Sequence, residues 1–169
     1  MDLFRQTLPW LALWLISLPV TALEEGEPAP DFTLPALAAA SGDSDEITLS
    51  DLRGKVVYVD FWASWCLPCI RSLPEISTLY EQYRDQGFEV IAITIDNPLE
   101  DATEFLEDLD TPLDYRVAAD ADADVMDLYG VRGMPTSFLV DRHGMIRMIH
   151  EGYRDGDLQQ IENELTPLL

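Results

Sequence analysis

Two cysteines, Cys66 and Cys69, are the only ones in the chain, and two residues separate them. When a helix begins at such a pair, the second sulfur comes within bonding distance of the first. The unpaired N–H groups and positive potential of a helix N-terminus then stabilise a thiolate on the first cysteine. Pro68 stiffens the first turn, where its missing N–H has no cost. The pair therefore predicts a redox-active dithiol.

Two other interpretations of the pair are weaker. A disulfide that closes so short a loop restricts the unfolded chain very little, so it would stabilise the fold poorly. A metal site needs two more ligands, and the histidines, His143 and His150, lie far along the chain without matching spacing. We therefore expect no metal and no cofactor.

The segments that must position the dithiol alternate between strands and helices. The apolar run Val56–Val59 predicts a strand buried on both faces, and apolar residues at helical spacing predict a helix from Ile70 to Tyr83. Further strands are expected at 31–34, 46–49, 90–95, 115–118, 136–140 and 145–150, and further helices at 99–109, 121–129 and 156–165. Residues 36–45 are expected to form a loop. This order predicts an α/β fold with a mixed central sheet flanked by helices.

The N-terminal residues 1–22 differ from the rest of the chain. Residues 8–20 are apolar, which is too short for a membrane-spanning helix of ~20 residues but fits the hydrophobic region of an export signal. Val20 and Ala22 supply small residues at a cleavage site. We predict a signal peptide over 1–22, with an uncleaved anchor as the alternative, and one domain over 23–169.

The net charge is −22, from 32 acidic and 10 basic residues. Such a surface repels the phosphates of nucleic acids and the headgroups of anionic lipids. The charge therefore excludes nucleic acid as a partner, and we expect membrane attachment only if the N-terminal segment stays uncleaved.

The segment Val59–Cys69, Val-Asp-Phe-Trp-Ala-Ser-Trp-Cys-Leu-Pro-Cys, resembles the active-site segment of the thioredoxin superfamily. Pro74 matches the proline that kinks that family's active-site helix, and Gly130–Thr136 resembles its cis-proline loop. With the export segment, Leu52–Lys55 and the extra helix and strand of residues 99–118, the chain is similar to the exported TlpA/ResA-type thiol-disulfide oxidoreductases. The resemblance implies a thioredoxin fold with an inserted helix-strand unit and an N-terminal strand pair.

The resemblance also implies roles for individual residues. Cys66 would be the attacking thiolate and Cys69 the buried resolving thiol, and the two would form the redox disulfide. Pro135 would be cis, and the backbone of Met134 would pair with a bound substrate strand. Trp65 would form a wall of the site.

Three positions leave alternatives open. Asp60 matches the buried aspartate of thioredoxin. Because a buried carboxylate destabilises the fold unless it has a function, we expect Asp60 to be a general base with a raised pKa beneath the second cysteine. The alternative is a carboxylate that faces solvent. Trp62 either flanks the site or packs in the core. Ser72 stands where cytochrome-maturation relatives often have a glutamate, which weakens an assignment to cytochrome c maturation.

The implied function is that of an enzyme, an exported thiol-disulfide oxidoreductase in the periplasm or another extracytoplasmic space, with attachment to the membrane as the alternative. It would reduce protein disulfides at Cys66-Leu67-Pro68-Cys69, with a membrane thiol-electron transporter as reductant, and we expect a monomer. The alternatives are a disulfide oxidase or isomerase and a copper-handling assembly factor. A peroxiredoxin is disfavoured, because Val59 and Ala63 occupy the proline and threonine places of the Pro-x-x-x-Thr-x-x-Cys pattern.

Overall fold

The structure is a computed structural model, and it describes residues 23–38 and 45–169. The segment predicted to be a signal peptide or anchor, residues 1–22, lies outside the described residues. Among the residues described, no helix has the length and apolar character needed to cross a membrane.

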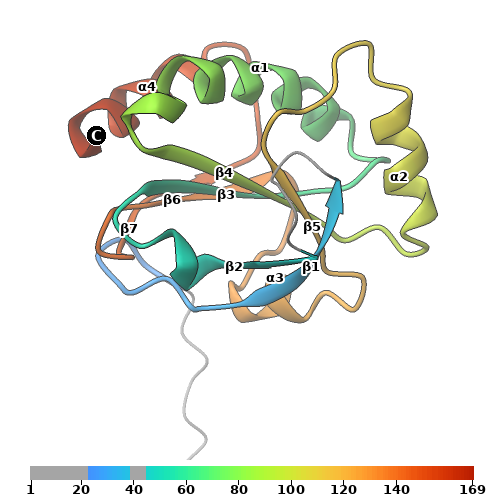
Figure 1. Cartoon of the computed structure of the whole chain (residues 1–169), viewed down its shortest axis with the longest axis horizontal. Coiled ribbons are helices and arrows are strands. Elements are labelled where there is room, and N and C mark those ends of the chain that lie inside the picture. The colour runs from blue at the N-terminus through green and yellow to red at the C-terminus, as the bar shows by residue number, and fades with distance from the viewer. Residues whose placement is uncertain (1–22, 39–44) are drawn as a thin grey trace, which may run out of the picture.

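The described part of the chain forms a seven-stranded sheet with the strand order β2-β1-β5-β4-β3-β6-β7 (Figure 1). The strands are β1 (Thr33–Ala38), β2 (Glu46–Thr48), β3 (Val56–Trp62), β4 (Phe88–Thr94), β5 (Arg116–Ala119), β6 (Thr136–Val140) and β7 (Ile146–Glu151). The α-helices are α1 (Leu67–Tyr83), α2 (Glu100–Glu107), α3 (Asp124–Leu128) and α4 (Asp157–Leu165), and the 3-10 turns are Leu49–Leu52, Arg84–Gln86 and Thr166–Leu168.

Strands β3, β4 and β5 pair in parallel, whereas β6, β7, β1 and β2 join the sheet through antiparallel pairs. The unit α2–β5 lies between β4 and β6 in sequence, and the β1–β2 pair extends the sheet beyond β5. The predicted thioredoxin fold, with its mixed sheet, inserted helix-strand unit and N-terminal strand pair, is therefore confirmed.

Strand β3 shows how the two faces of the sheet are divided. Val56, Tyr58 and Trp62 pack into the core beneath α1 and α4, whereas Val57, Val59 and Phe61 pack in a second cluster with α3 and apolar residues of 29–34. Because alternate residues of a strand point to opposite faces, Asp60 lies on the same face as Tyr58 and Trp62. This register directs the carboxylate of Asp60 toward α1.

The predicted loop over 36–45 is wrong at its start, because β1 continues to Ala38. Ala36 and Ala38 pair with Ala118 and Val117 of β5. The sequence of small residues does not itself indicate a strand, and the extended backbone is fixed by pairing with the inserted strand. The other expected elements are present with ends displaced by a few residues.

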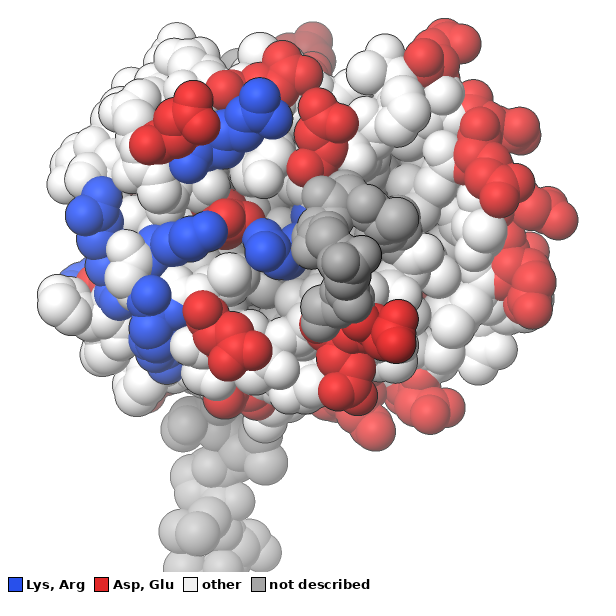
Figure 2. Space-filling view, in the orientation of Figure 1, with Lys and Arg blue, Asp and Glu red and all other residues white. Residues whose placement is uncertain are grey.

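Charged residues are unevenly distributed over the surface. Figure 2 shows acidic side chains along the edge where α2 lies and basic side chains mainly on the opposite side of the same view. Helix α2 contributes the exposed carboxylates Glu100, Asp101, Glu104 and Glu107 to that edge.

Candidate active site

The two cysteines lie where β3 leads into α1. Cys66 is the residue that caps the N-terminus of α1, and its Sγ accepts a hydrogen bond from the backbone N–H of Cys69 at 3.3 Å. Pro68 lies in the first turn, where no N–H is required. The two cysteines form a disulfide bond, with their Cα atoms 5.2 Å apart. The helix N-terminus therefore directs an N–H group at the Cys66 sulfur, which becomes a thiolate when the disulfide is reduced.

The two sulfurs differ in how they meet the surface. Cys66 keeps 6% of its surface exposed, whereas Cys69 is fully buried. Cys66 also lines a groove, of which Cys69 is not part. Of the two sulfurs, that of Cys66 is therefore the one accessible from the groove.

The groove beside Cys66 is mainly apolar and has a volume of about 510 Å³. Trp65 and Leu67 stand beside it with 66% and 75% of their surfaces exposed. Its lining residues are Trp65, Cys66, Leu67, Pro68, Ile95, Met126, Arg132, Gly133 and Met134. Arg132 is the single charged residue among them, so the groove fits an apolar stretch of an extended peptide.

The loop before β6 forms another side of this groove. The peptide bond between Met134 and Pro135 is cis, as the resemblance implies. The hydroxyl of Thr136 donates to the carbonyl of Gly133 at 2.7 Å, and the carbonyl of Pro135 accepts from the N–H of Gly152 at 2.7 Å. These two bonds hold the loop, and the proline presents no backbone N–H beside the disulfide.

The two tryptophans near the dithiol have different environments. Trp62 is fully buried and packs against Phe105 of α2, with ring centroids 5.5 Å apart. Trp65 is exposed at the groove. Of the two interpretations of Trp62, core packing therefore holds.

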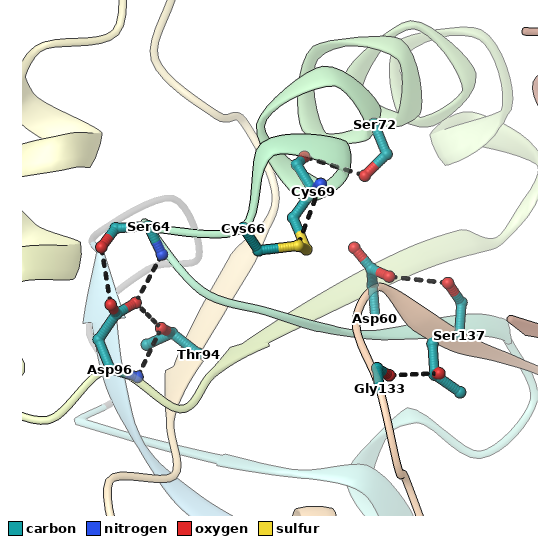
Figure 3. The surroundings of a disulfide bond; sticks show 10 residues. Asp60, Ser64, Cys66, Cys69, Ser72, Thr94, Asp96, Gly133 and Ser137 are labelled. Atoms are coloured by element: carbon teal, nitrogen blue, oxygen red, sulfur yellow. Dashed lines mark hydrogen bonds between the residues drawn. A yellow bond between two sulfur atoms is a disulfide. The ribbon is translucent and has the colours of Figure 1, made fainter. Parts of the chain in front are cut away.

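Asp60 lies beneath the disulfide on the α1 side of the sheet (Figure 3). It is 2% exposed, and its Oδ1 accepts a hydrogen bond from the hydroxyl of Ser137 at 2.7 Å. Its Oδ2 is buried with no hydrogen-bond partner, and the unbonded oxygen points toward the disulfide. The solvent-facing alternative for Asp60 is therefore wrong.

Burial determines the acidity of this carboxyl group. Loss of hydration raises the pKa of Asp60 to about 7, and the hydrogen bond from Ser137 partly opposes that rise. The same negative charge adds to burial in raising the pKa of Tyr58 and Tyr115. At neutral pH Asp60 can therefore either accept or give a proton.

Ser72 lies one turn along α1 from the disulfide. It is 2% exposed, and its hydroxyl donates to the carbonyl of Cys69 at 3.0 Å. At this position a glutamate would add a second carboxylate to the helix face that packs over the sheet, whereas Ser72 adds no charge. Asp60 is therefore the carboxylate that this chain places beneath its dithiol.

Sequence reasoning missed three residues of the site. Ile95 and Met126 line the groove from the segment after β4 and from α3. Asp96 is fully buried and accepts hydrogen bonds from Ser64 in the turn before the dithiol. The only local signal was an acidic residue directly after a buried strand, in the segment Ile95-Asp96-Asn97-Pro98.

No group of three or more histidine, cysteine, aspartate and glutamate side chains suited to a metal ion occurs within residues 23–38 and 45–169.

Comparison with known proteins agrees with this chemistry. The sequence model of the Redoxin family matches residues 24–165. The thiol-disulfide oxidoreductase ResA of Geobacillus thermodenitrificans is 36% identical over 132 residues, which cover 78% of this chain and 72% of that protein. The ResA of Halalkalibacterium halodurans is 33% identical over 144 residues, covering 85% and 76%.

Solved structures with the same fold include two thiol-disulfide proteins. A Chlorobium tepidum protein assigned as a thiol:disulfide interchange protein of the DsbE type has a TM-score of 0.80 and 40% identity, covering 87% of this chain and 99% of that one. The thioredoxin domain of a thiol-disulfide oxidoreductase from Bacteroides vulgatus has a TM-score of 0.69 and 28% identity, covering 86% and 100%.

Proposed function

Because this chain belongs to the Redoxin family, as a thiol-disulfide oxidoreductase similar to ResA, we propose that it reduces disulfide bonds of proteins outside the cytoplasm. The observation that carries the proposal is the Cys66–Cys69 disulfide at the edge of an apolar groove, above the carboxylate of Asp60. A dithiol at a helix N-terminus, a proton acceptor and a groove for a peptide are the parts that dithiol exchange requires.

The reaction proceeds in two exchanges. In the reduced protein, the thiolate of Cys66 attacks one sulfur of a substrate disulfide, which forms a mixed disulfide and releases the other substrate sulfur as a thiolate. Cys69 then loses its proton to Asp60, directly or through a water, and attacks the Cys66 sulfur. The second substrate thiolate leaves and takes up a proton. The substrate gains two electrons, and the protein is left as the Cys66–Cys69 disulfide.

The substrate segment binds in the groove in an extended conformation. Its backbone pairs with Met134 beside Pro135, and its apolar side chains contact Trp65 and Leu67. A comparison of peptides in which leucine or serine flanks a mixed disulfide tests this arrangement. Trp65→Ala should abolish most of the preference for leucine, whereas Leu128→Ala, which removes an exposed apolar side chain outside the groove, should leave it. Equal preference in both variants would contradict this binding mode.

The proposal includes export and a dedicated electron donor. Residues 1–22 act as a signal peptide or as an uncleaved anchor, and residues 23–169 form one thioredoxin-like domain that acts as a monomer. A reductase outside the cytoplasm needs electrons from within, and a membrane thiol-electron transporter supplies them. Cell fractionation followed by N-terminal sequencing distinguishes a soluble chain beginning at Leu23 from a membrane-bound chain beginning at Met1.

The reduction potential of the Cys66/Cys69 couple tests the direction of electron flow. Equilibration with glutathione should give a potential near −270 mV, as for thioredoxin-type reductants, because the protein must donate electrons to its substrates. A potential near −120 mV would instead identify the disulfide oxidase. A Cys69→Ser variant should accumulate mixed disulfides with exported proteins, and Cys66→Ser is the matched control that should trap none.

Two narrower functions are separated by further measurements. A copper-handling assembly factor would bind Cu⁺ through the reduced dithiol, so copper titration of the wild type against Cys66→Ser tests that alternative. Reduction of an apocytochrome peptide tests a role in cytochrome c maturation. Ser72 leaves that helix position without a carboxylate, so our proposal is the reduction of protein disulfides without restriction to apocytochromes.

A further inference from the structure

Asp96 is a buried carboxylate that the exchange reaction does not use. It lies just after β4, is fully buried, and accepts three hydrogen bonds (Figure 3). Ser64 donates two of them, from its backbone N–H to Oδ2 at 2.9 Å and from its hydroxyl to Oδ1 at 2.7 Å. The hydroxyl of Thr94 donates the third to Oδ2 at 2.5 Å.

Ser64 belongs to the turn that carries the reactive cysteine. It lies two residues before Cys66, and the N–H of Cys66 closes the turn by donating to the carbonyl of Ala63 at 3.0 Å. Because Asp96 binds Ser64 through both backbone and side chain, this turn is tied to the end of β4. The position from which the Cys66 sulfur faces the groove therefore depends on Asp96.

Among the described residues, no cationic side chain forms an ion pair with the carboxylate of Asp96. Its three donors are uncharged. Two residues of chain span at most about 7 Å, so this carboxylate lies within roughly 10 Å of the Cys66 backbone. The other charged groups facing the dithiol are Asp60 from β3 and Arg132 across the groove.

We propose that Asp96 positions Cys66 through Ser64 and that its negative charge makes the Cys66/Cys69 couple more reducing than it would be without that charge. A negative charge near Cys66 disfavours its thiolate, and a less stable reduced form makes the couple a stronger reductant. At ~10 Å and an effective dielectric constant of ~20, the repulsion changes the ionisation constant of Cys66 on the order of tenfold. This is also the upper limit of the change in the equilibrium with glutathione, reached at a pH where reduced Cys66 is mainly thiolate. The inference rests on Cys66 and Cys69 being the redox couple of the proposed function, whatever the direction of electron flow.

The variant Asp96→Asn tests the charge, because it keeps the shape and one acceptor for Ser64. The measurements are the equilibrium constant with glutathione and the alkylation rate of reduced Cys66 by iodoacetamide as a function of pH. The equilibrium should move roughly three- to tenfold toward the reduced protein, which is about 15–30 mV, and alkylation should begin at lower pH. Glu107→Gln, which changes the net charge equally on the exposed face of α2, should change neither quantity.

The variant Ser64→Ala tests the positioning, because it keeps the charge and loses the bond from the hydroxyl. It should slow formation of the mixed disulfide several-fold while the glutathione equilibrium stays within about twofold of wild type. An unchanged rate in Ser64→Ala, or an equilibrium in Asp96→Asn within twofold of wild type, would overturn the inference. If Asp96→Asn does not fold, Ser64→Ala still decides the positioning. Failure of the proposed function itself would appear differently, as a wild-type protein that does not exchange with glutathione.

Discussion

Asp60 and Ser137 are direct cross-strand partners in the antiparallel pair of β3 and β6, and the Ser137 hydroxyl donates to Oδ1 of Asp60 at 2.7 Å. This bond occupies one carboxylate oxygen and leaves the other, Oδ2, buried without a partner. The register of two strands thus keeps one oxygen available on the side of the disulfide. Ser137 also limits the rise of the pKa of Asp60, which remains about 7.

Replacing Asp60 with asparagine should slow turnover at neutral pH. The amide cannot take the proton of Cys69, and burial raises the pKa of that thiol. General base catalysis of this kind contributes about 10²-fold or more, so we expect a loss of roughly that size near pH 7 and partial recovery near pH 9. Mixed-disulfide formation at Cys66 should change much less. Steady-state turnover and single-turnover trapping, measured across pH, separate the two steps.

The matched control is Ser137→Ala, which keeps the base and removes the bond that lowers its pKa. Its pH profile should shift upward while the maximal rate stays near that of wild type. If Asp60→Asn turned over as fast as wild type between about pH 6 and pH 8, Asp60 would have only a structural role.

The substitution Asp60→Asn should also stabilise the oxidised protein above neutral pH. The pKa of Asp60 is raised in the folded state, from 3.8 to about 7, so folding favours the protonated carboxyl. Stability from this group is fully present below about pH 4 and is lost as the pH rises through about 7. Near pH 8 the free energy of unfolding of Asp60→Asn, measured by denaturant titration, should therefore exceed that of wild type by about 2–4 kcal/mol. Near pH 4 the two free energies of unfolding should be nearly equal. A gain independent of pH would contradict this linkage.

The parts of the site that could be predicted from the sequence are those that depend on neighbouring residues in the chain. Cys66 and Cys69 follow a buried strand and open a helix, so their position could be inferred from neighbouring residues alone. The cis bond before Pro135 and the burial of Asp60 followed from the resemblance, because both belong to short motifs.

The contacts that escaped prediction depend on the pairing of distant segments. Asp96 and Ser64 are 32 residues apart, and they meet because β3 and β4 are parallel neighbours whose carboxyl ends lie together. Met126 reaches the groove because α3 packs on the face of the sheet opposite α1. The end of β1 is extended because Ala38 pairs with β5. None of these relationships leaves a periodic signal in the sequence.

Cys66 should react before Cys69 when the reduced protein is alkylated near pH 7. Its sulfur borders the groove and the N-terminus of α1, whereas Cys69 is fully enclosed. Peptide mapping after brief exposure to iodoacetamide should show at least about tenfold more label on Cys66, because the thiolate is the reacting form and the helix terminus stabilises it. In Cys66→Ser, labelling of Cys69 should remain slow. Preferential labelling of Cys69 in wild type would reverse the assignment of attacking and resolving thiols.

Salt should stabilise this protein. A chain of net charge −22 repels itself, and the repulsion between exposed carboxylates is screened within ~8 Å at 0.15 M ionic strength. The midpoint of thermal unfolding should therefore rise by several degrees between about 20 mM and about 1 M sodium chloride. Part of the repulsion comes from the acidic edge along α2 (Figure 2). Glu104 and Glu107 of this helix are exposed and lie three residues apart, and Glu107 lies near the negative end of the helix dipole. Glu104→Gln/Glu107→Gln should raise the midpoint at low salt and reduce its rise with salt. Arg154→Gln, which removes an exposed positive charge, should do the reverse. A midpoint that stays flat or falls with salt in the wild type would show that self-repulsion contributes little to its stability.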